Sequence, residues 1–451
     1  MSDAIWIKQP LAVYTANAQD AAGGVVIRDG QITELVPAGG APLTRIDSVF
    51  DAADCVLLPG LINAHHHFYQ TLTRAFTPAL NKRLFPWLQT LYPVWARLTA
   101  EQLAVASRLA MTELLLSGCT TASDHHYLFT DALSEAIDIE LQEAQALGMR
   151  VVLTRGSMSL GRDQGGLPPQ HTVQSEPVIL ADSERLVRSY HQSGDGAMQQ
   201  IALAPCSPFS VSRELMQETA ALARRLGVRL HTHLAETADE NSFCLREFGL
   251  RPLDYLEDCD WLGDDVWLAH GIHFNDEEVA RLGRHGTAIC HCPSSNMLLA
   301  SGICRSTELE AAGVPLGLGV DGSASNDASN MIAEVRQALL IQRLRYQADE
   351  VTHLDALRWA TRGSARCLGR DDIGELAVGK RADLALFRCD DLNFSGAGDP
   401  LAALVLCAAQ RAAHVMVEGR WLVRDGRALH VDTEALRAEH QQAAKQLQHR
   451  L

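Results

Sequence analysis

An alternation of apolar strands with amphipathic helices runs through the middle of the chain and constrains its fold more than any other feature. Eight apolar runs of strand length end in polar residues: VLLPGLINAHHH, TTASDHH, RVVLTRGS, QIALAPCS, VRLHTHLAE, DVWLAHGI, GTAICHCPSSN and VPLGLGVDGS. Helical patterns separate several of them, at 99–118, 131–148, 212–227 and 275–286. This order is typical of parallel β-α-β units. Eight units favour an α/β fold closed into a (β/α)8 barrel of TIM type over an open sheet.

The two ends of the chain differ from this middle because they carry short apolar runs broken by polar turns. Residues 5–58 include GGVVIRDGQITELV, in which RDG between two apolar runs predicts a hairpin. RADLALF, HVMVEGRWLV and RDGRALHV have the same character near the other end. We expect both ends to form one small β-sandwich, with residues 1–58 and 369–451 as a composite domain and residues 59–368 as the barrel.

The charge of the chain narrows its partners. The formal net charge is −16, which repels phosphate backbones and anionic lipid. A small-molecule substrate is therefore expected, with neither a nucleic-acid nor a membrane partner. The first residues do not resemble a signal peptide, and no apolar run in the sequence is long enough to span a bilayer. The eleven cysteines form no paired framework, which favours a reducing, cytoplasmic location.

Histidines at the end of the first apolar strand suggest a metal site. His65 and His67 stand two residues apart, so strand geometry turns both toward the mouth of the barrel. Two neutral imidazoles that converge there suit a divalent metal such as zinc. His66 lies between them and is expected to face the other way, in a structural role.

Two further strand ends carry polar side chains that core packing does not explain. His233 ends the fifth strand, Glu236 follows three residues later, and Asp321 ends the eighth strand. His231 has the same strand parity as His233, so spacing leaves open which of the two binds a metal. Catalytic residues of barrel enzymes lie at the carboxyl ends of the strands, and we therefore expect these groups to meet at one rim.

Several motifs occur together in an order that is specific as a set. Through LLPGLINAHHH, HTHLAE, LAHGI, HCPSSNMLLASG and GLGVDGSASN the chain resembles the mononuclear deaminase branch of the amidohydrolase superfamily over essentially its whole length. The resemblance implies that the metal ligands are His65, His67, His233 and Asp321. It also implies that Glu236 and His270 lie in the reacting site.

The fourth strand bears on the number of metals. Binuclear relatives carry a bridging lysine or glutamate there, but this chain reads QIALAPCSPFS, so one zinc per subunit is expected. In the mechanism that the resemblance implies, zinc lowers the pKa of a bound water from ~15.7 to about 7. Asp321 accepts the water proton and His270 orients the nucleophile. Glu236 protonates a ring nitrogen and helps ammonia to leave.

The substrate is expected to be a flat, purine-like ring that carries an amino group. Gln70 stands where guanine deaminases place a glutamine for the purine, but Cys206 replaces the arginine with which they grip guanine. The segment 81–102, with Trp87, Tyr92 and Trp95, is similar to that of 8-oxoguanine deaminases and triazine hydrolases. These aromatic rings could line a pocket for a flat ring or pack a lid helix on the barrel. An oxidised purine such as 8-oxoguanine, converted to urate and ammonia, is the first choice.

Other substrates and one other class of function are alternatives. The substrates are s-triazines, isoxanthopterin, guanine, methylthioadenosine and S-adenosylhomocysteine. The other class is a barrel that has lost catalysis and serves in assembly, and the complete set of candidate ligands weighs against it. Relatives commonly form dimers or larger assemblies, so we also expect a homo-oligomer.

Overall fold

The eight apolar runs form eight strands of one sheet in the computed structural model, which describes residues 3–409 and 411–449. The strands are β7 (Leu61–Asn63), β8 (Cys119–His126), β9 (Arg150–Ser157), β10 (Gln199–Pro205), β11 (Leu230–Leu234), β12 (Val266–His270), β13 (Ala288–His291) and β14 (Leu316–Leu318). Neighbours pair in chain order, all in parallel. Ala64 N donates to Leu318 O, and Asp321 N donates to His65 O, which joins the last strand to the first. The predicted (β/α)8 barrel is confirmed.

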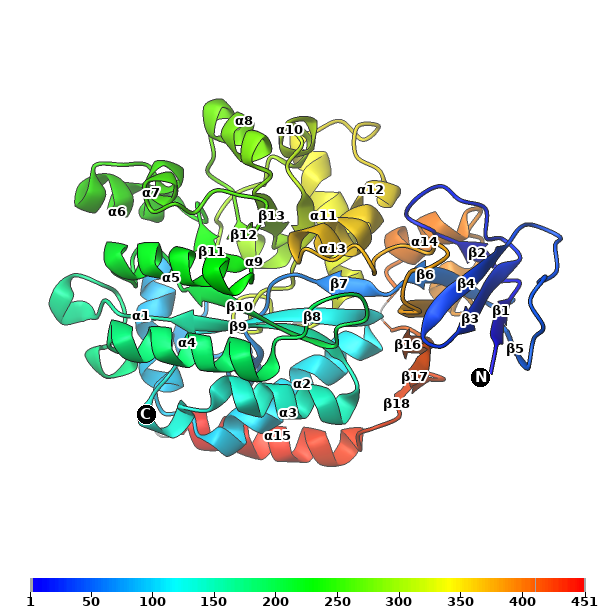
Figure 1. Cartoon of the computed structure of the whole chain (residues 1–451), viewed down its shortest axis with the longest axis horizontal. Coiled ribbons are helices and arrows are strands. Elements are labelled where there is room, and N and C mark those ends of the chain that lie inside the picture. The colour runs from blue at the N-terminus through cyan, green and yellow to red at the C-terminus, as the bar shows by residue number, and fades with distance from the viewer. Residues whose placement is uncertain (1–2, 410, 450–451) are drawn as a thin grey trace.

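Helices lie around this barrel and beside it (Figure 1). They are α1 (Leu84–Trp95), α2 (Ala100–Leu116), α3 (Ala136–Leu147), α4 (Glu176–Tyr190), α5 (Arg213–Leu226), α6 (Ala238–Phe248), α7 (Pro252–Asp258), α8 (Asp276–His285), α9 (Pro293–Leu298), α10 (Ser306–Ala311), α11 (Met331–Arg345), α12 (His353–Arg358), α13 (Ser364–Cys367), α14 (Pro400–Leu406) and α15 (Thr433–Gln448). The four predicted helices correspond to α2, α3, α5 and α8. Reciprocal capping bonds begin α2 at Thr99 and α8 at Asn275.

Strands from both ends of the chain form two small sheets beside the barrel, as expected (Figure 1). One sheet has the order β4 (Gln31–Val36), β3 (Gly24–Arg28), β1 (Ile5–Lys8), β5 (Ser48–Asp51). The other has the order β18 (Arg427–Ala428), β17 (Arg420–Arg424), β16 (His414–Val417), β15 (Leu384–Arg388), β6 (Cys55–Pro59), β2 (Ala12–Val13). β6 and β15 pair antiparallel and so join the two ends.

The apolar faces of these two sheets share one core. Ile7, Val25 and Leu57 from the first part of the chain pack in one buried cluster with Leu384 and Met416 from the last part. The predicted hairpin joins β3 to β4 through Asp29 and Gly30, both with positive φ (55° and 74°), as a tight two-residue turn requires. The division of the chain at residues 58 and 368 stays a proposal.

Helix α15 lies against the barrel, next to α2, rather than against the small sheets (Figure 1). It also contacts the short 3-10 turn η1 (Phe68–Thr73), which directly follows His67. His440 Nε2 and Thr71 Oγ1 are 3.0 Å apart, and Gln448 Nε2 donates to Leu72 O at 2.7 Å. The helix therefore clamps the turn that carries Gln70.

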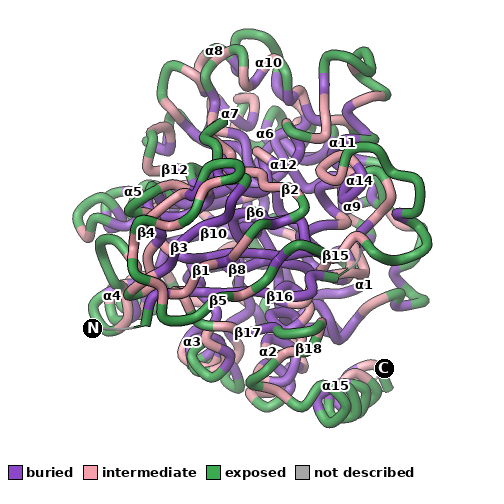
Figure 2. The backbone as a smooth tube through the Cα atoms, turned by 90° about the vertical axis from the view of Figure 1, so that its right-hand side faces the viewer, coloured by how far each residue is buried: buried purple, intermediate pink, exposed green. Residues whose placement is uncertain are grey.

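Burial follows this plan. The barrel strands run through the buried interior, while loops and outer helix faces are exposed (Figure 2). Within the described part of the chain, no helix has both the length and the apolar composition needed to cross a membrane.

Candidate active site and metal centre

Polar side chains from four strand ends meet at one mouth of the barrel. His65 and His67 follow β7, His233 lies in β11, His270 ends β12, and Asp321 follows β14. All are buried except His233, which is partly exposed. His270 and Asp321 have positive φ values of 73° and 61°, a strained conformation for such residues that is typical of functional sites.

The tautomers of His67 and His233 leave two lone pairs facing one another. His67 Nδ1 lies 2.7 Å from His125 O, and His233 Nδ1 lies 2.6 Å from Cys206 O. A carbonyl oxygen only accepts, so each Nδ1 carries the hydrogen and each neutral ring keeps a lone pair at Nε2. The two Nε2 atoms are 3.2 Å apart. Two lone pairs at this distance repel unless a cation lies between them, so the residues fit a metal ion.

His65 is oriented by a relay of hydrogen bonds. His231 Nδ1 donates to Trp267 O at 2.8 Å, which leaves His231 Nε2 free to accept from His65 Nδ1, also at 2.8 Å. The His231 ring stacks on Trp267 with centroids 4.3 Å apart. His65 Nε2 thus keeps its lone pair and faces the centre. Spacing left His231 and His233 as equal candidates for a metal ligand. In the structure, His231 accepts a hydrogen bond from His65 Nδ1 and so orients the ring of His65.

Asp321 supplies a charged oxygen to the same point. Its Oδ1 lies 3.4 Å from His65 Nε2 and 3.3 Å from His67 Nε2. Gly322 N donates to Oδ1 at 2.7 Å and Ser325 Oγ donates to Oδ2 at 3.3 Å, and these bonds favour the ionised carboxylate. Ligands roughly 2.0–2.2 Å from a tetrahedral zinc would be about 3.3–3.6 Å apart, close to the separations of these atoms.

His270 is held with a hydrogen on the nitrogen that faces the centre. Its Nδ1 lies 3.1 Å from the amide Nδ2 of Asn296, which can only donate, so Nδ1 accepts and Nε2 carries the hydrogen. His270 Nε2 is 3.6 Å from Glu236 Oε2 and 4.0 Å from Asp321 Oδ2. Burial lowers the pKa of His270 to about 4, so the ring is neutral. Sequence analysis did not single out Asn296, although it lies in the HCPSSN motif.

Glu236 lies at the edge of the centre with a carboxyl group suited to holding a proton. Burial raises its pKa well above the usual range, and the nearby charges of Asp321 and Glu240 raise it further. Its backbone N–H donates to Glu240 Oε2 at 2.9 Å, which fixes the loop after β11. The arrangement lets Glu236 give a proton to a ligand in the cavity.

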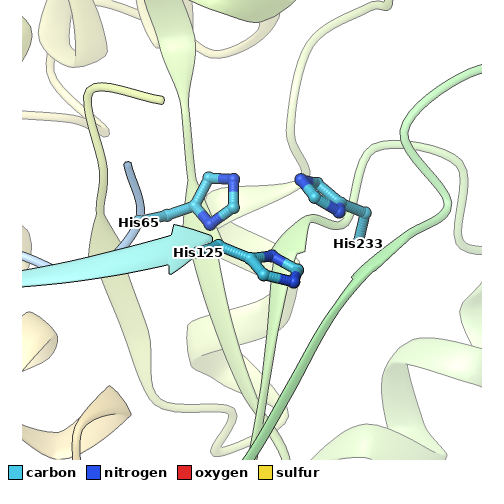
Figure 3. Close-up of side chains that lie close together, drawn as sticks. All are labelled: His65, His125 and His233. Carbon is cyan, nitrogen blue, oxygen red and sulfur yellow. The ribbon is translucent and has the colours of Figure 1, made fainter. Parts of the chain in front are cut away.

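His125 is a second residue that sequence analysis missed. Figure 3 shows it at the end of β8, below His65 and His233. Its ring stacks on His233 with centroids 4.7 Å apart, and its Nε2 lies 2.9 Å from Ala204 O. One ligand atom each of His65, His125 and His233 lie within 4.8 Å of one another, as do those of His65, His270 and Asp321. The run SDHH at the end of the second strand was the available signal.

His66 turns away from the centre, as predicted. Its Nε2 lies 2.9 Å from Ser329 Oγ, and its Nδ1 accepts from the backbone N–H of His67.

A second buried group of the same residue types lies on the other side of β8. This β8–α3 cluster consists of Asp124 and His126 of β8 and Glu140 of α3, whose ligand atoms also lie within 4.8 Å of one another. His126 Nδ1 is 3.2 Å from Glu140 Oε1, and Asp124 Oδ1 accepts from the backbone N–H of Phe68 at 2.5 Å. Burial raises the pKa of Asp124 well above its usual range and that of Glu140 to about 8.

A cavity opens beside the metal centre, and its wall includes His67, His233, His270 and Asp321. Of the predicted substrate residues, Gln70, Cys206 and Trp87 line it. Gln70 Oε1 accepts from Ala324 N at 3.3 Å, so its amide N–H groups are left for a ligand. Trp95 is not among the described residues that line the cavity. Its Nε1 donates to Thr73 Oγ1, and its ring packs against that of Trp87, with centroids 5.5 Å apart.

Comparison with known proteins agrees with this geometry. Residues 56–422 match the Amidohydrolase family. The chain is 65% identical to an 8-oxoguanine deaminase of Pseudomonas aeruginosa, over 98% of both chains. It is 36% identical to an isoxanthopterin deaminase of an unknown prokaryotic organism, over 92% of this chain and 91% of that one. Among solved structures, an atrazine chlorohydrolase of Arthrobacter aurescens TC1 complexed with zinc superposes with a TM-score of 0.91 at 30% identity, over 98% of this chain and 100% of that one.

Proposed function

The chain belongs to the amidohydrolase family, and we propose that it is a zinc-dependent deaminase that hydrolyses 8-oxoguanine to urate and ammonia. The observation that carries the proposal is 65% identity to an 8-oxoguanine deaminase over 98% of both chains. The cavity beside a buried centre of histidine and aspartate is consistent with a small, flat substrate.

We assign one zinc per subunit to His65, His67, His233 and Asp321. The lone pairs of the three rings, fixed by carbonyl oxygens and by His231, support this set, and so does the ionised carboxyl group of Asp321. When bound, zinc supplies a water whose pKa falls from ~15.7 to about 7, which makes a nucleophile available near neutral pH.

The protein's own residues then handle the protons. Asp321 takes the proton that the attacking water releases, because its carboxyl group is ionised. His270 directs its Nε2 hydrogen toward the attacking oxygen and holds that oxygen in position. Glu236 enters the reaction protonated and gives its proton to the ring nitrogen next to the amino-bearing carbon. The proton that Asp321 took passes to the departing amine, which leaves as ammonia. As the new C=O bond forms, the remaining hydrogen of the added water returns to Glu236, which helps the amine to leave. Water and 8-oxoguanine go in, and urate and ammonia come out.

The cavity wall orients the ring. Gln70 offers its amide N–H groups to the part of the ring that 8-oxoguanine and guanine share. Trp87 offers an apolar face, since its Nε1 is already bonded to Ala324 O at 3.2 Å. Burial raises the pKa of Cys206 to about 12, so it presents a neutral thiol.

The test is ammonia release by the zinc-loaded protein from a panel of 8-oxoguanine, guanine, isoxanthopterin and methylthioadenosine, with urate followed as the product of the first. We expect 8-oxoguanine to have by far the highest kcat/KM, and Gln70→Ala to lower kcat/KM for both 8-oxoguanine and guanine. Turnover of another member of the panel without turnover of 8-oxoguanine would refute the substrate but leave a metal-dependent deaminase.

We further propose a homo-oligomer in the cytoplasm. Exposed leucines occur on α11, α12 and α14, helices that contact one another: Leu340, Leu344, Leu354 and Leu406. Such a surface suits self-association. All eleven cysteines are free thiols, which suits a reducing compartment. Light scattering after size-exclusion chromatography measures the assembly, and a monomeric mass would exclude it.

A further inference from the structure

Tyr92 carries a buried hydroxyl group that the protein leaves unbonded. Its side chain is 0% exposed, and its Oη has no hydrogen-bond partner within residues 3–409 and 411–449. A buried hydroxyl group without a partner is costly, and most such groups in native proteins are bonded. Burial also raises the pKa of Tyr92 well above its usual range, so the group keeps its proton and can donate it.

Helix α1 contributes Tyr92 to the wall of the active-site cavity. Leu84, Trp87, Leu88 and Tyr92 all line the cavity, at a spacing that puts them on one face of the helix. The Nε1 of Trp87 is already bonded to Ala324 O. Among these four side chains, Tyr92 Oη is therefore the polar atom that remains for a ligand.

Two tyrosines of the cavity wall have different ring contacts. The ring of Tyr127, which also lines the cavity, is 5.2 Å from the ring of His67. Tyr92 instead packs against Trp95, with ring centroids 6.0 Å apart. In a purine, C2 and C8 lie at opposite ends of the long axis. A purine whose C2 faces the metal centre therefore directs its C8 end away from the centre.

The C8 end is where the two purines differ. 8-Oxoguanine has a carbonyl oxygen at C8 and an N–H at N7, whereas guanine has a C–H at C8. A tyrosine hydroxyl group can donate a hydrogen bond to that carbonyl oxygen. Against the C–H of guanine it would stay unpaired. A site that leaves its own polar group unpaired with the wrong substrate discriminates far more strongly than an apolar wall does.

The geometry points to Tyr92 Oη as the donor that recognises the C8 carbonyl oxygen of 8-oxoguanine, and so as the residue that sets the preference for an oxidised purine. This inference rests on the proposed function. In this assignment Gln70 binds the part of the ring that both purines share, and Tyr92 binds the part that distinguishes 8-oxoguanine from guanine.

The test is Tyr92→Phe, which deletes one oxygen atom and keeps the ring. In the zinc-loaded enzyme, kcat/KM for 8-oxoguanine should fall roughly 10–100-fold, while kcat/KM for guanine should change by less than about threefold. The ratio between the substrates therefore shrinks. Equal losses for both purines, or no loss for either, would overturn the assignment.

Tyr255→Phe is the matched control. Tyr255 on α7 is also 0% exposed with an Oη that finds no partner among the described residues, but it packs on Phe248, at 4.2 Å between ring centroids, and does not belong to the cavity lining. Its substitution should leave kcat/KM unchanged for both substrates. A loss of 8-oxoguanine selectivity in this control would also contradict the inference.

Two readouts do not depend on turnover. In a Glu236→Gln background, Tyr92→Phe should weaken the binding of 8-oxoguanine but not of guanine, as measured by titration calorimetry. The Tm of unliganded Tyr92→Phe should stay level or rise, because the lost hydroxyl group was unbonded; a marked fall would show that it is bonded within the protein and refute the inference. A wild-type enzyme that binds 8-oxoguanine selectively but does not deaminate it would instead refute the proposed function alone.

Discussion

Adjacent residues of β8 belong to two different buried clusters. The clusters contain the same residue types but differ in the protonation of their carboxyl groups. His125 lies against the metal centre, whereas Asp124 and His126 point to the other side of the strand and meet Glu140 of α3. Side chains alternate along a strand, so one β-strand can serve both clusters. Each cluster gathers imidazole and carboxyl groups within 4.8 Å, and composition alone would make either a metal site.

The protonation of the carboxyl groups separates the two clusters. In the metal centre, hydrogen bonds from Gly322 N and Ser325 Oγ favour the ionised form of Asp321, despite its burial. In the β8–α3 cluster, burial wins, and it raises the pKa of Glu140 to about 8. The first cluster is therefore suited to bind a cation, whereas the carboxyl groups of the second cluster hold protons. This difference between the clusters depends more on the hydrogen-bond partners of the remaining ring nitrogen and carboxyl oxygen atoms than on the residue types present.

The largest effect expected from this comparison is on the metal itself. Asp321→Asn removes the ionised oxygen and should abolish both zinc binding and turnover. Asp124→Asn, which can still accept from the Phe68 N–H, should keep about one zinc per chain. Metal analysis of the purified variants, with ammonia release alongside, decides this. A second zinc in the wild type that Asp124→Asn removes would erase the distinction between the clusters.

Glu236→Gln tests whether a protonated carboxyl group inside the metal centre does chemistry rather than binding. Turnover should fall by at least ~10²-fold with zinc retained, because the amide cannot transfer a proton. Glu240→Gln is the control: Glu240 is buried beside it, and the amide can still accept from the Glu236 N–H. Loss of zinc from Glu236→Gln would show that Glu236 is a ligand.

His231→Phe tests the relay that orients His65. The phenyl ring can keep the stacking on Trp267 but cannot accept from His65 Nδ1. Removal of such a partner costs roughly 10–100-fold in metal affinity, so zinc should bind that much more weakly and saturating zinc should restore most of the turnover. Competition with a chelator measures the affinity. An unchanged affinity would mean that the relay is incidental.

The smallest effect is on the pH dependence of stability, through the β8–α3 cluster. The pKa of Glu140 rises from 4.5 to about 8 on folding, so between these values the folded state binds the additional proton and stability falls as pH rises. This contribution is complete below the lower value and lost as pH passes the upper one. Glu140→Gln stays neutral, so its Tm relative to the wild type should rise by a few degrees from about pH 5 to about pH 8.

Asp138→Asn on the same helix provides a control of opposite sign. Burial raises the pKa of Asp138, but hydrogen bonds from Arg185 and Tyr190 outweigh burial and lower it, so its contribution is lost only as pH falls through the acid range. Between about pH 5 and about pH 8 its effect on Tm should therefore be constant. An equal pH dependence in both variants would contradict the protonated state of Glu140.

Patterns local in sequence predicted much of the fold and the core of the site. Strand alternation fixed the barrel, and strand ends followed by histidine or aspartate marked the residues that meet at its mouth. What sequence could not supply were partners brought in from elsewhere by the fold. The role of His231 depends on the Trp267 carbonyl group one strand away, and that of Asn296 on the ring of His270. Trp95 has a helical spacing compatible with the pocket, but its bond to Thr73 turns it inward.

The clamp of α15 on the η1 turn has a consequence for the order of events during synthesis. His440 and Gln448 are 369 and 376 residues beyond the groups they bind. At 5–20 residues per second, the ribosome needs roughly 20–75 s to make the clamp after it has made the turn. Asp321 emerges long before His440. A nascent chain therefore holds every proposed zinc ligand before it can steady Gln70, so metal capture can precede the ordering of the substrate pocket.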